Sequence, residues 1–149
     1  MTDIYADGAS AATIAGGRQN TIRESANYSF LGGGFGNDIG TNAAYSVIAG
    51  GDGNNVGTSS GTSVVGGGQG NSIADNSGAD VIAGGIFNSI HTNSVGCVIG
   101  GGFDNGIAAN SDSSSLGGGF QNSIARNTLG ATLAGGVGNF ASSNYSASG

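Results

Sequence analysis

The chain has 149 residues, of which 33 are Gly and none is Pro, and only 8% are charged, with a formal net charge of −6. Soluble globular domains carry about 25% charged residues, and disordered chains are rich in charge and Pro, so neither class fits this composition. Three Arg and no Lys offer no basic surface for nucleic acid or an anionic membrane, and no apolar run is long enough to span a bilayer.

Residues 1–10 contain no basic start followed by an apolar stretch, so they do not predict a secretory signal. They anticipate the repeat that follows, because Asp3 and Tyr5 stand 17 residues before Asn20 and Ile22. We interpret residues 1–10 as a degenerate half repeat or an N-terminal cap.

From residue 11 to residue 146, one unit of 17 residues occurs eight times without insertion or deletion. Each copy has an aliphatic residue, a Gly-Gly pair two residues later, an Asn three residues after the pair, and a second aliphatic residue two residues after the Asn. The last copy has Ala141 at the second aliphatic position, and residues 147–149 begin an incomplete ninth repeat. The Asn positions are Asn20, Asn37, Asn54, Asn71, Asn88, Asn105, Asn122 and Asn139.

The composition of the unit excludes a helix, because Gly-Gly in every copy costs about 2 kcal/mol relative to Ala. Pairs such as Val47-Ile48 and Ser72-Ile73, separated by Gly and Asn, are typical of two short strands and two turns per coil. Constant coil length indicates that each coil stacks in register on the previous one. The sequence therefore predicts an all-β fold, a parallel β-solenoid (β-roll or β-helix) roughly 38 Å long at about 4.8 Å per coil.

Stacking places each repeat position above its equivalent in the next coil, so equivalent residues form columns. The two aliphatic columns are expected to point inward. The Asn column is expected to be a buried amide ladder that bonds turn backbone and the neighbouring Asn side chains. A second Asn-rich column, running from Ser25 to Asn144, fits the opposite turn, where Asn tolerates a left-handed conformation. Gly-Gly fits positive φ or close backbone approach.

Two further columns are apolar and are expected to face outward. With only two inward aliphatic residues per coil the core is thin, which favours burial against other chains. Outward apolar columns mark such an interface, and we expect a homo-oligomer, most simply a parallel homotrimer. The alternative is that they widen the core of a monomer. The columns comprise Phe30, Val47, Val64, Val81 and Val98, and Phe35, Ile86, Phe103, Phe120 and Val137.

The repeat resembles a known pattern, carried by Ser46–Gly51 followed by Asn54, and by Val98–Ile107. It is similar to the Gly-Gly-x-x-Asn repeats in the shafts of phage tail fibres and of bacterial surface fibre proteins, and more distantly to the head repeats of trimeric autotransporter adhesins. The resemblance implies a trimeric, extracellular or virion-borne fibre that holds or forms a receptor-binding surface. Adhesin head repeats are shorter, so their coil shape does not carry over.

Residues capable of chemistry are scattered. His91 lies in a variable column, where a solvated side chain is expected, and Cys97 replaces Ser in a column of small residues, where it fills space. Gly51–Asn54 is similar to a calcium-binding turn, but the motif occurs once instead of in every coil. We expect no catalytic residues, no metal and no cofactor, although a cleft between subunits could still assemble two carboxylates. Six acids fall in six different columns, namely Asp38, Asp52, Asp75, Asp80, Asp104 and Asp112.

These observations predict a structural fibre segment that serves attachment. Tyr28 and Tyr45 share a column and should stack about 4.8 Å apart, as a surface for a sugar, a receptor or another subunit. The alternative is a filament subunit that stacks head to tail on its own copies. A glycan-degrading module fits less well, and so does an ice-binding solenoid, because the candidate Thr column (Thr41, Thr58 and Thr92) is irregular.

Overall fold

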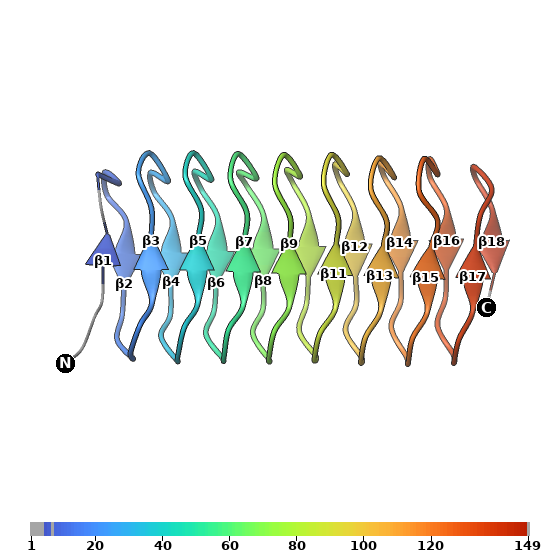
Figure 1. Cartoon of the computed structure of the whole chain (residues 1–149), viewed down its shortest axis with the longest axis horizontal. Coiled ribbons are helices and arrows are strands. Elements are labelled where there is room, and N and C mark those ends of the chain that lie inside the picture. The colour runs from blue at the N-terminus through green and yellow to red at the C-terminus, as the bar shows by residue number, and fades with distance from the viewer. Residues whose placement is uncertain (1–4, 7, 149) are drawn as a thin grey trace.

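The computed structural model describes residues 5, 6 and 8–148, and within them the chain winds into a parallel β-solenoid with no helix (Figure 1). Each coil contributes two strands of two residues, and the strands alternate between two parallel sheets of nine strands each. The fold predicted from the 17-residue repeat is therefore confirmed. No helix in the described residues is long and apolar enough to cross a membrane.

The odd-numbered strands form one sheet: β1 (Tyr5–Ala6), β3 (Thr21–Ile22), β5 (Asp38–Ile39), β7 (Asn55–Val56), β9 (Ser72–Ile73), β11 (Ser89–Ile90), β13 (Gly106–Ile107), β15 (Ser123–Ile124) and β17 (Phe140–Ala141). The even-numbered strands form the other: β2 (Thr13–Ile14), β4 (Phe30–Leu31), β6 (Val47–Ile48), β8 (Val64–Val65), β10 (Val81–Ile82), β12 (Val98–Ile99), β14 (Ser115–Leu116), β16 (Thr132–Leu133) and β18 (Ala147–Ser148).

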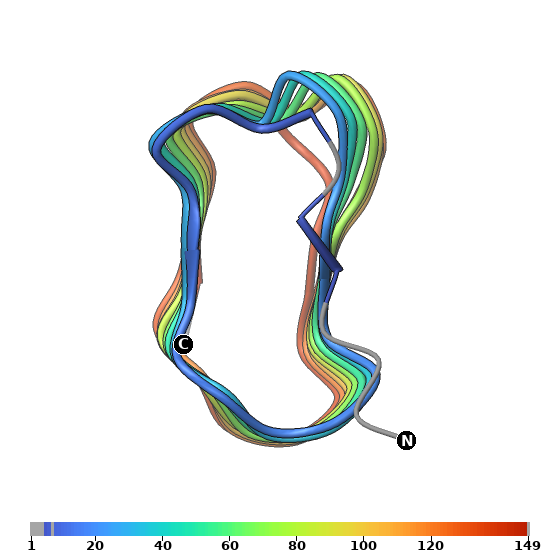
Figure 2. The same ribbon diagram turned by 90° about the vertical axis from the view of Figure 1, so that its left-hand side faces the viewer.

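Alternation along each strand separates the core from the surface, because successive side chains point to opposite faces. The second residue of each strand from β2 to β17 points inward, so Ile48 of β6 and Ile73 of β9 are fully buried. The view along the rod shows the coils superposed as one closed outline, with the strands on its two long sides (Figure 2). The core is thus a pair of continuous aliphatic ladders between the sheets.

A third line of parallel pairing follows each Gly-Gly pair. It consists of single-residue bridges, such as Phe35 to Asp52 and Phe103 to Phe120, and lies outside both sheets. The residue after the Gly pair donates its N–H to the carbonyl of the second Gly in the next coil, as Phe35 does to Gly51 at 2.9 Å. The sequence did not predict this third contact between coils.

The coil has three left-handed corners instead of the two turns that the sequence predicts. One corner is the second Asn-rich column, where Asn42 has a φ of 58°, as expected. The other two carry varied residues, for example Tyr45 at 61° and Asp104 at 55°. At every regular corner the left-handed residue donates its N–H to a carbonyl 18 residues earlier, as Tyr45 does to Asn27. The same backbone hydrogen bond therefore builds all three corners.

The first and last coils depart from the 17-residue register. Tyr5 pairs with Thr21 and Ala6 with Ile22, so Tyr5 does not occupy the aliphatic column, whereas Asp3 lies outside the described residues. Tyr145, at a φ of 53°, donates its N–H to Leu129, so the last turn reaches its final corner two residues early. Ala147 consequently pairs with Thr132 in a strand position. Residues 147–149 thus begin at a strand position, not at the corner that the repeat assigns to them.

The Asn side chains form a continuous ladder through the interior. The Asn71 Nδ2 lies 2.8 Å from the Gly67 carbonyl, 2.8 Å from the Gly85 carbonyl and 3.2 Å from the Asn54 Oδ1. The Asn71 Oδ1 accepts from the backbone N–H and the side-chain amide of Asn88, at 3.0 and 3.1 Å. Each Asn from Asn37 to Asn122 thus donates to two Gly carbonyls and joins three successive coils.

The second Gly of each pair has both features expected of it, a positive φ and close backbone approach. Gly68 has a φ of 91°, and a Cβ at this position would overlap the carbonyl oxygen of Gly85. Gly53, at a corner, has a φ of 65° but no neighbouring atom near the position of a Cβ. Side chains are therefore excluded at Gly68 and only conformationally restricted at Gly53.

Replacing Asn71 by Ala should lower the free energy of unfolding by about 3–5 kcal/mol, because each buried group left without a partner costs about 1–3 kcal/mol. The matched control is Asn55→Ser, since Asn55 is half-buried and its column already contains Ser72 and Ser89. This control should cost less than about 1 kcal/mol. Urea unfolding followed by circular dichroism measures both, and equal losses would contradict the ladder's role.

Replacing Gly68 by Ala should cost about 3 kcal/mol or more, because the added Cβ forces two coils apart. Gly53→Asn should cost less than about 1 kcal/mol, since Asn tolerates this conformation. Both substitutions place a side chain at a positive φ, so thermal unfolding of the pair separates steric overlap from conformational strain. A Gly68→Ala variant as stable as Gly53→Asn would refute the close packing at the Gly column.

Candidate interaction surfaces

Tyr28 and Tyr45 form an exposed aromatic pair at one corner of the coil. Both have left-handed backbone, with φ values of 59° and 61°, and their side chains are 58% and 60% exposed. The rings stack with centroids 5.1 Å apart and planes 10° apart. Ala11 and Thr62 hold the same corner in the adjacent coils, so no other ring of this column stacks on the pair. The spacing predicted from the coil repeat is therefore confirmed.

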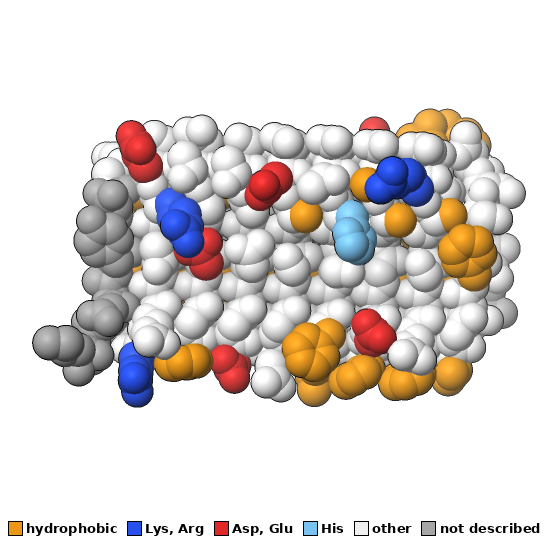
Figure 3. Space-filling model, viewed as in Figure 1, with side chains coloured by type: hydrophobic (Ala, Val, Ile, Leu, Met, Phe, Trp, Pro, Cys, Tyr) orange, Lys and Arg blue, Asp and Glu red, His pale blue; other side chains and the backbone are white. Residues whose placement is uncertain are grey.

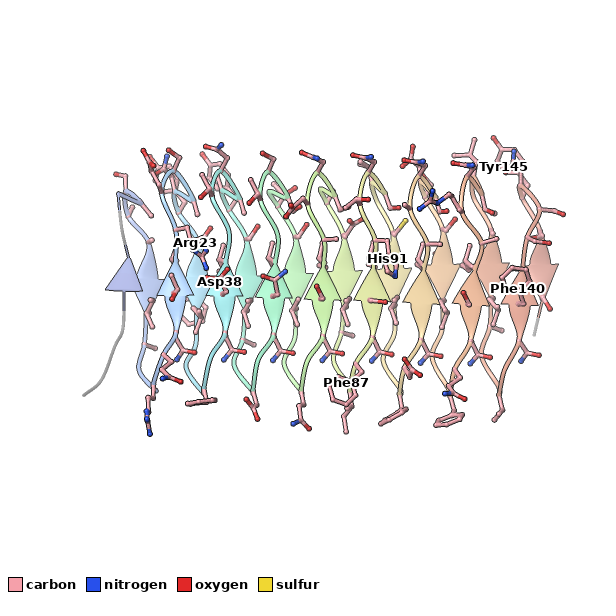
Figure 4. The ribbon with its side chains drawn as sticks, viewed as in Figure 1. Arg23, Asp38, Phe87, His91, Phe140 and Tyr145 are labelled. Carbon is pink, nitrogen blue, oxygen red and sulfur yellow. The ribbon has the colours of Figure 1, made fainter. Side chains whose placement is uncertain are left out.

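The column after the Gly pairs is apolar along its second half, and we call Ile86, Phe103, Phe120 and Val137 the apolar column. All four side chains are exposed, and the rings of Phe103 and Phe120 stack at 5.4 Å with an angle of 16°. Phe87, labelled in Figure 4, meets the ring of Phe103 edge-on at 6.0 Å. Figure 3 shows hydrophobic side chains in a row along the lower edge of the rod.

Phe35 and Phe30 lie apart from the apolar column. Phe35 shares its line of bridges, but Asp52 and Gln69 separate it from Ile86, and the Arg18 guanidinium lies 5.8 Å from its ring centroid. Phe30 is exposed on the outer face of the even-numbered sheet, in β4. The candidate surface residues named from sequence therefore divide among three sides of the coil. Among the named Phe residues, Phe103 and Phe120 contact each other and Phe103 also contacts Phe87.

Among the described residues, the exposed charged groups are scattered apart from one ion pair. The His91 Nε2 lies 3.4 Å from the Ser89 Oγ at the surface, and Figure 4 shows the ring on the outer face of β11. Arg23 and Asp38 form an ion pair at 2.9 Å. Among the described residues, no group of three or more His, Cys, Asp or Glu side chains could hold a metal ion.

A second buried polar column lies at the small position before the even-numbered strands from β4 to β14. In it, the Ser46 Oγ donates to the Ser60 carbonyl at 3.2 Å and accepts the Ser63 N–H at 3.3 Å. Ser63 repeats both bonds one coil further along. The 17-residue recurrence of small residues was visible in the sequence, but its hydrogen-bonding role was missed. The serine column, as we call it, consists of Ser29, Ser46, Ser63, Asp80, Cys97 and Ser114.

Asp80 and Cys97 are neighbours in the serine column, although the sequence suggested only a scattered acid and a space-filling thiol. Both are fully buried, and the Asp80 Oδ1 accepts the Cys97 N–H at 2.6 Å. Burial raises the pKa of Asp80 to about 7, against the opposing effect of this hydrogen bond. Burial likewise raises the pKa of the Cys97 thiol to about 12. A carboxyl group that ionises near neutral pH thus lies inside the rod.

This geometry defines the class: a parallel β-solenoid of 17-residue coils with internal Asn and Ser columns and outward aromatic residues. No protein-family model matches the chain, and a search of curated proteins also gives no match. The functional argument therefore rests on the sites themselves.

Proposed function

We propose that this chain is a structural rod, a segment of a fibre that serves attachment at an extracellular or virion surface. The observation that carries the proposal is the apolar column, exposed along one edge of a rod whose coils repeat without interruption. The rod is held along its axis by backbone hydrogen bonds, the Asn ladder and the serine column. Such a repetitive scaffold is better suited to holding attached parts at a fixed separation and to bearing mechanical load than to catalysis.

Self-association in parallel is the second part of the proposal. Copies of one chain share the same coil spacing, so parallel copies keep matching contacts along their length. The column is apolar from Ile86 to Val137 and contains Arg18 and Asp52 before that. We therefore assign the contact between copies to the last four coils, because the column contains no charged residue there that would face its own copy in a parallel neighbour. The resemblance to fibre shafts supports three copies, and hence a homotrimer.

Attachment requires a ligand surface, and the Tyr28–Tyr45 pair is the best candidate. Its outer ring faces lie beside the small residue Ala11 and the short side chain of Thr62, which leaves room for a flat apolar face. Sugar rings present such faces, and the Tyr hydroxyl groups add hydrogen-bonding capacity. We propose that a cell-surface glycan contacts this corner while the apolar column is covered by neighbouring chains.

The double variant Phe103→Gln/Phe120→Gln should convert the wild-type trimer to a monomer, because it places polar groups at the centre of the contact. Light scattering measures the mass, and circular dichroism checks that the coil is intact. Phe35→Gln is the control, since Phe35 lies outside the apolar column and should leave the mass unchanged. A monomeric wild-type chain would contradict the interface, and indefinite fibrils in negative-stain images would favour the head-to-tail filament.

Tyr28→Ala should weaken glycan binding by about two- to tenfold, because a stacking contact contributes roughly 0.5–1.5 kcal/mol beyond its buried area. A glycan array identifies the binding sugar for the wild-type chain, and titration calorimetry measures the change. Tyr145→Ala is the matched control, since this exposed Tyr lies at the irregular last corner and has no stacked partner among the described residues. Unchanged affinity in Tyr28→Ala would remove the Tyr pair as the ligand surface.

A further inference from the structure

The serine column is interrupted by one acidic residue, Asp80. In the coils on either side the column residue donates a hydrogen bond, and Ser63 also accepts one, from the Asp80 N–H. Ser63 donates to the Ser77 carbonyl and Cys97 donates to the Ser111 carbonyl, each 14 residues further along the chain. A carboxylate can only accept, so an ionised Asp80 cannot fulfil the donor role of its position.

The Asp80 side chain has one satisfied oxygen and one that lacks a partner. Oδ1 accepts the Cys97 N–H, whereas Oδ2 is buried without any hydrogen bond. In the adjacent coils the column residue donates to a carbonyl 14 residues further along, that of Ser77 or of Ser111. The equivalent acceptor for position 80 is the Ser94 carbonyl. A protonated Oδ2 is the group that would complete this bond.

The charges around Asp80 also favour the neutral acid. Two titratable groups face it, the Cys97 thiol in the next coil and the Asp112 carboxylate one coil beyond, and neither carries a positive charge. The neighbour on the other side is the uncharged hydroxyl of Ser63. Backbone N–H groups of Cys97 and Gly96 favour ionisation, but burial outweighs them. A buried carboxylate without a cationic partner is costly, so the fold favours the protonated form.

We propose that Asp80 is a proton switch in the wall of the rod: the neutral acid donates Oδ2–H to the Ser94 carbonyl and closes the serine column, and loss of its proton to solvent loosens the junction between β10 and β12. The coils on both sides keep their own ladders, so the effect is confined to one place along the axis. The switch is independent of the ligand and of the oligomeric state proposed above.

The direction of the pH dependence follows from the folded pKa being raised from 3.8 to about 7. Well below pH 3.8 both folded and unfolded chains hold the proton, and the contribution of Asp80 to stability is complete. As the pH rises towards 7, the unfolded chain releases its proton while the folded chain keeps it, so stability falls. About three pKa units correspond to roughly a thousandfold change in the folding equilibrium.

The decisive experiment compares urea unfolding of the full chain and of Asp80→Asn between pH 4 and pH 8. The wild-type chain should lose stability across this range, and Asp80→Asn should lose about a thousandfold less, since an amide keeps both a donor and an acceptor at every pH. Asp52→Asn, at an exposed position, is the control and should follow the wild-type profile. Identical profiles for the wild-type chain and Asp80→Asn would overturn the proposal.

A local readout separates the switch from general destabilisation. The buried Cys97 thiol should react with a maleimide at equal rates in the wild-type chain and Asp80→Asn at pH 5, and at least tenfold faster in the wild-type chain at pH 8. Dividing the two rates at each pH removes the intrinsic titration of the thiol. Asp80→Ser, which restores the usual residue of the column, serves in place of Asp80→Asn if that variant folds poorly. A rate ratio that stays at one would refute a local opening.

Discussion

The structure depends on stacking identical coils in register, and the hydrogen bond between successive Asn side chains is the interaction that fixes that register. Asn71 accepts from Asn88 and donates to Asn54, so a shift of one residue would break the bonds on both sides at once. The same amide also donates to the carbonyls of Gly67 and Gly85, the second of which belongs to the close-packed Gly column. Close backbone packing and the amide ladder are therefore two parts of one constraint.

Much of this arrangement could be predicted from the sequence, because equivalent residues that recur every 17 positions allow the coils to stack in only one register. The aliphatic columns, the Asn ladder and the stacking of Tyr28 on Tyr45 all follow from that spacing. The three left-handed corners could not be predicted in full, since two of them carry residues such as Tyr45 and Phe87 that give no signal of positive φ. Their cause is a backbone hydrogen bond between coils, which only the folded chain contains.

The differences between the sequence-based expectation and the structure at Asp80 and in the last turn also have physical causes. Asp80 shares its column with no other acid, so its acidic neighbours in sequence gave no indication of its surroundings, and in the structure it lies between Ser63 and Cys97. Burial of the serine column, not its residue type, determines the chemistry of that position. The last turn differs because Tyr145 takes a corner two residues early, a deletion that the repeat pattern cannot reveal without the pairing of Ala147. For the candidate surface, the sequence identified the exposed rings and their three separate columns, but not the edge-on contact of Phe87 with Phe103.

The corners have a consequence for how such a chain can diversify. Because the left-handed residue is held through its own N–H, its side chain contributes nothing to closing the turn, and Tyr45, Thr62, Ala79 and Ser113 all occupy one corner column with φ values between 54° and 61°. Mutation there can exchange aromatic, polar and small groups while the interior columns stay constant. The surface chemistry of the rod can therefore evolve one coil at a time, because each corner residue can be substituted without any compensating change in the interior.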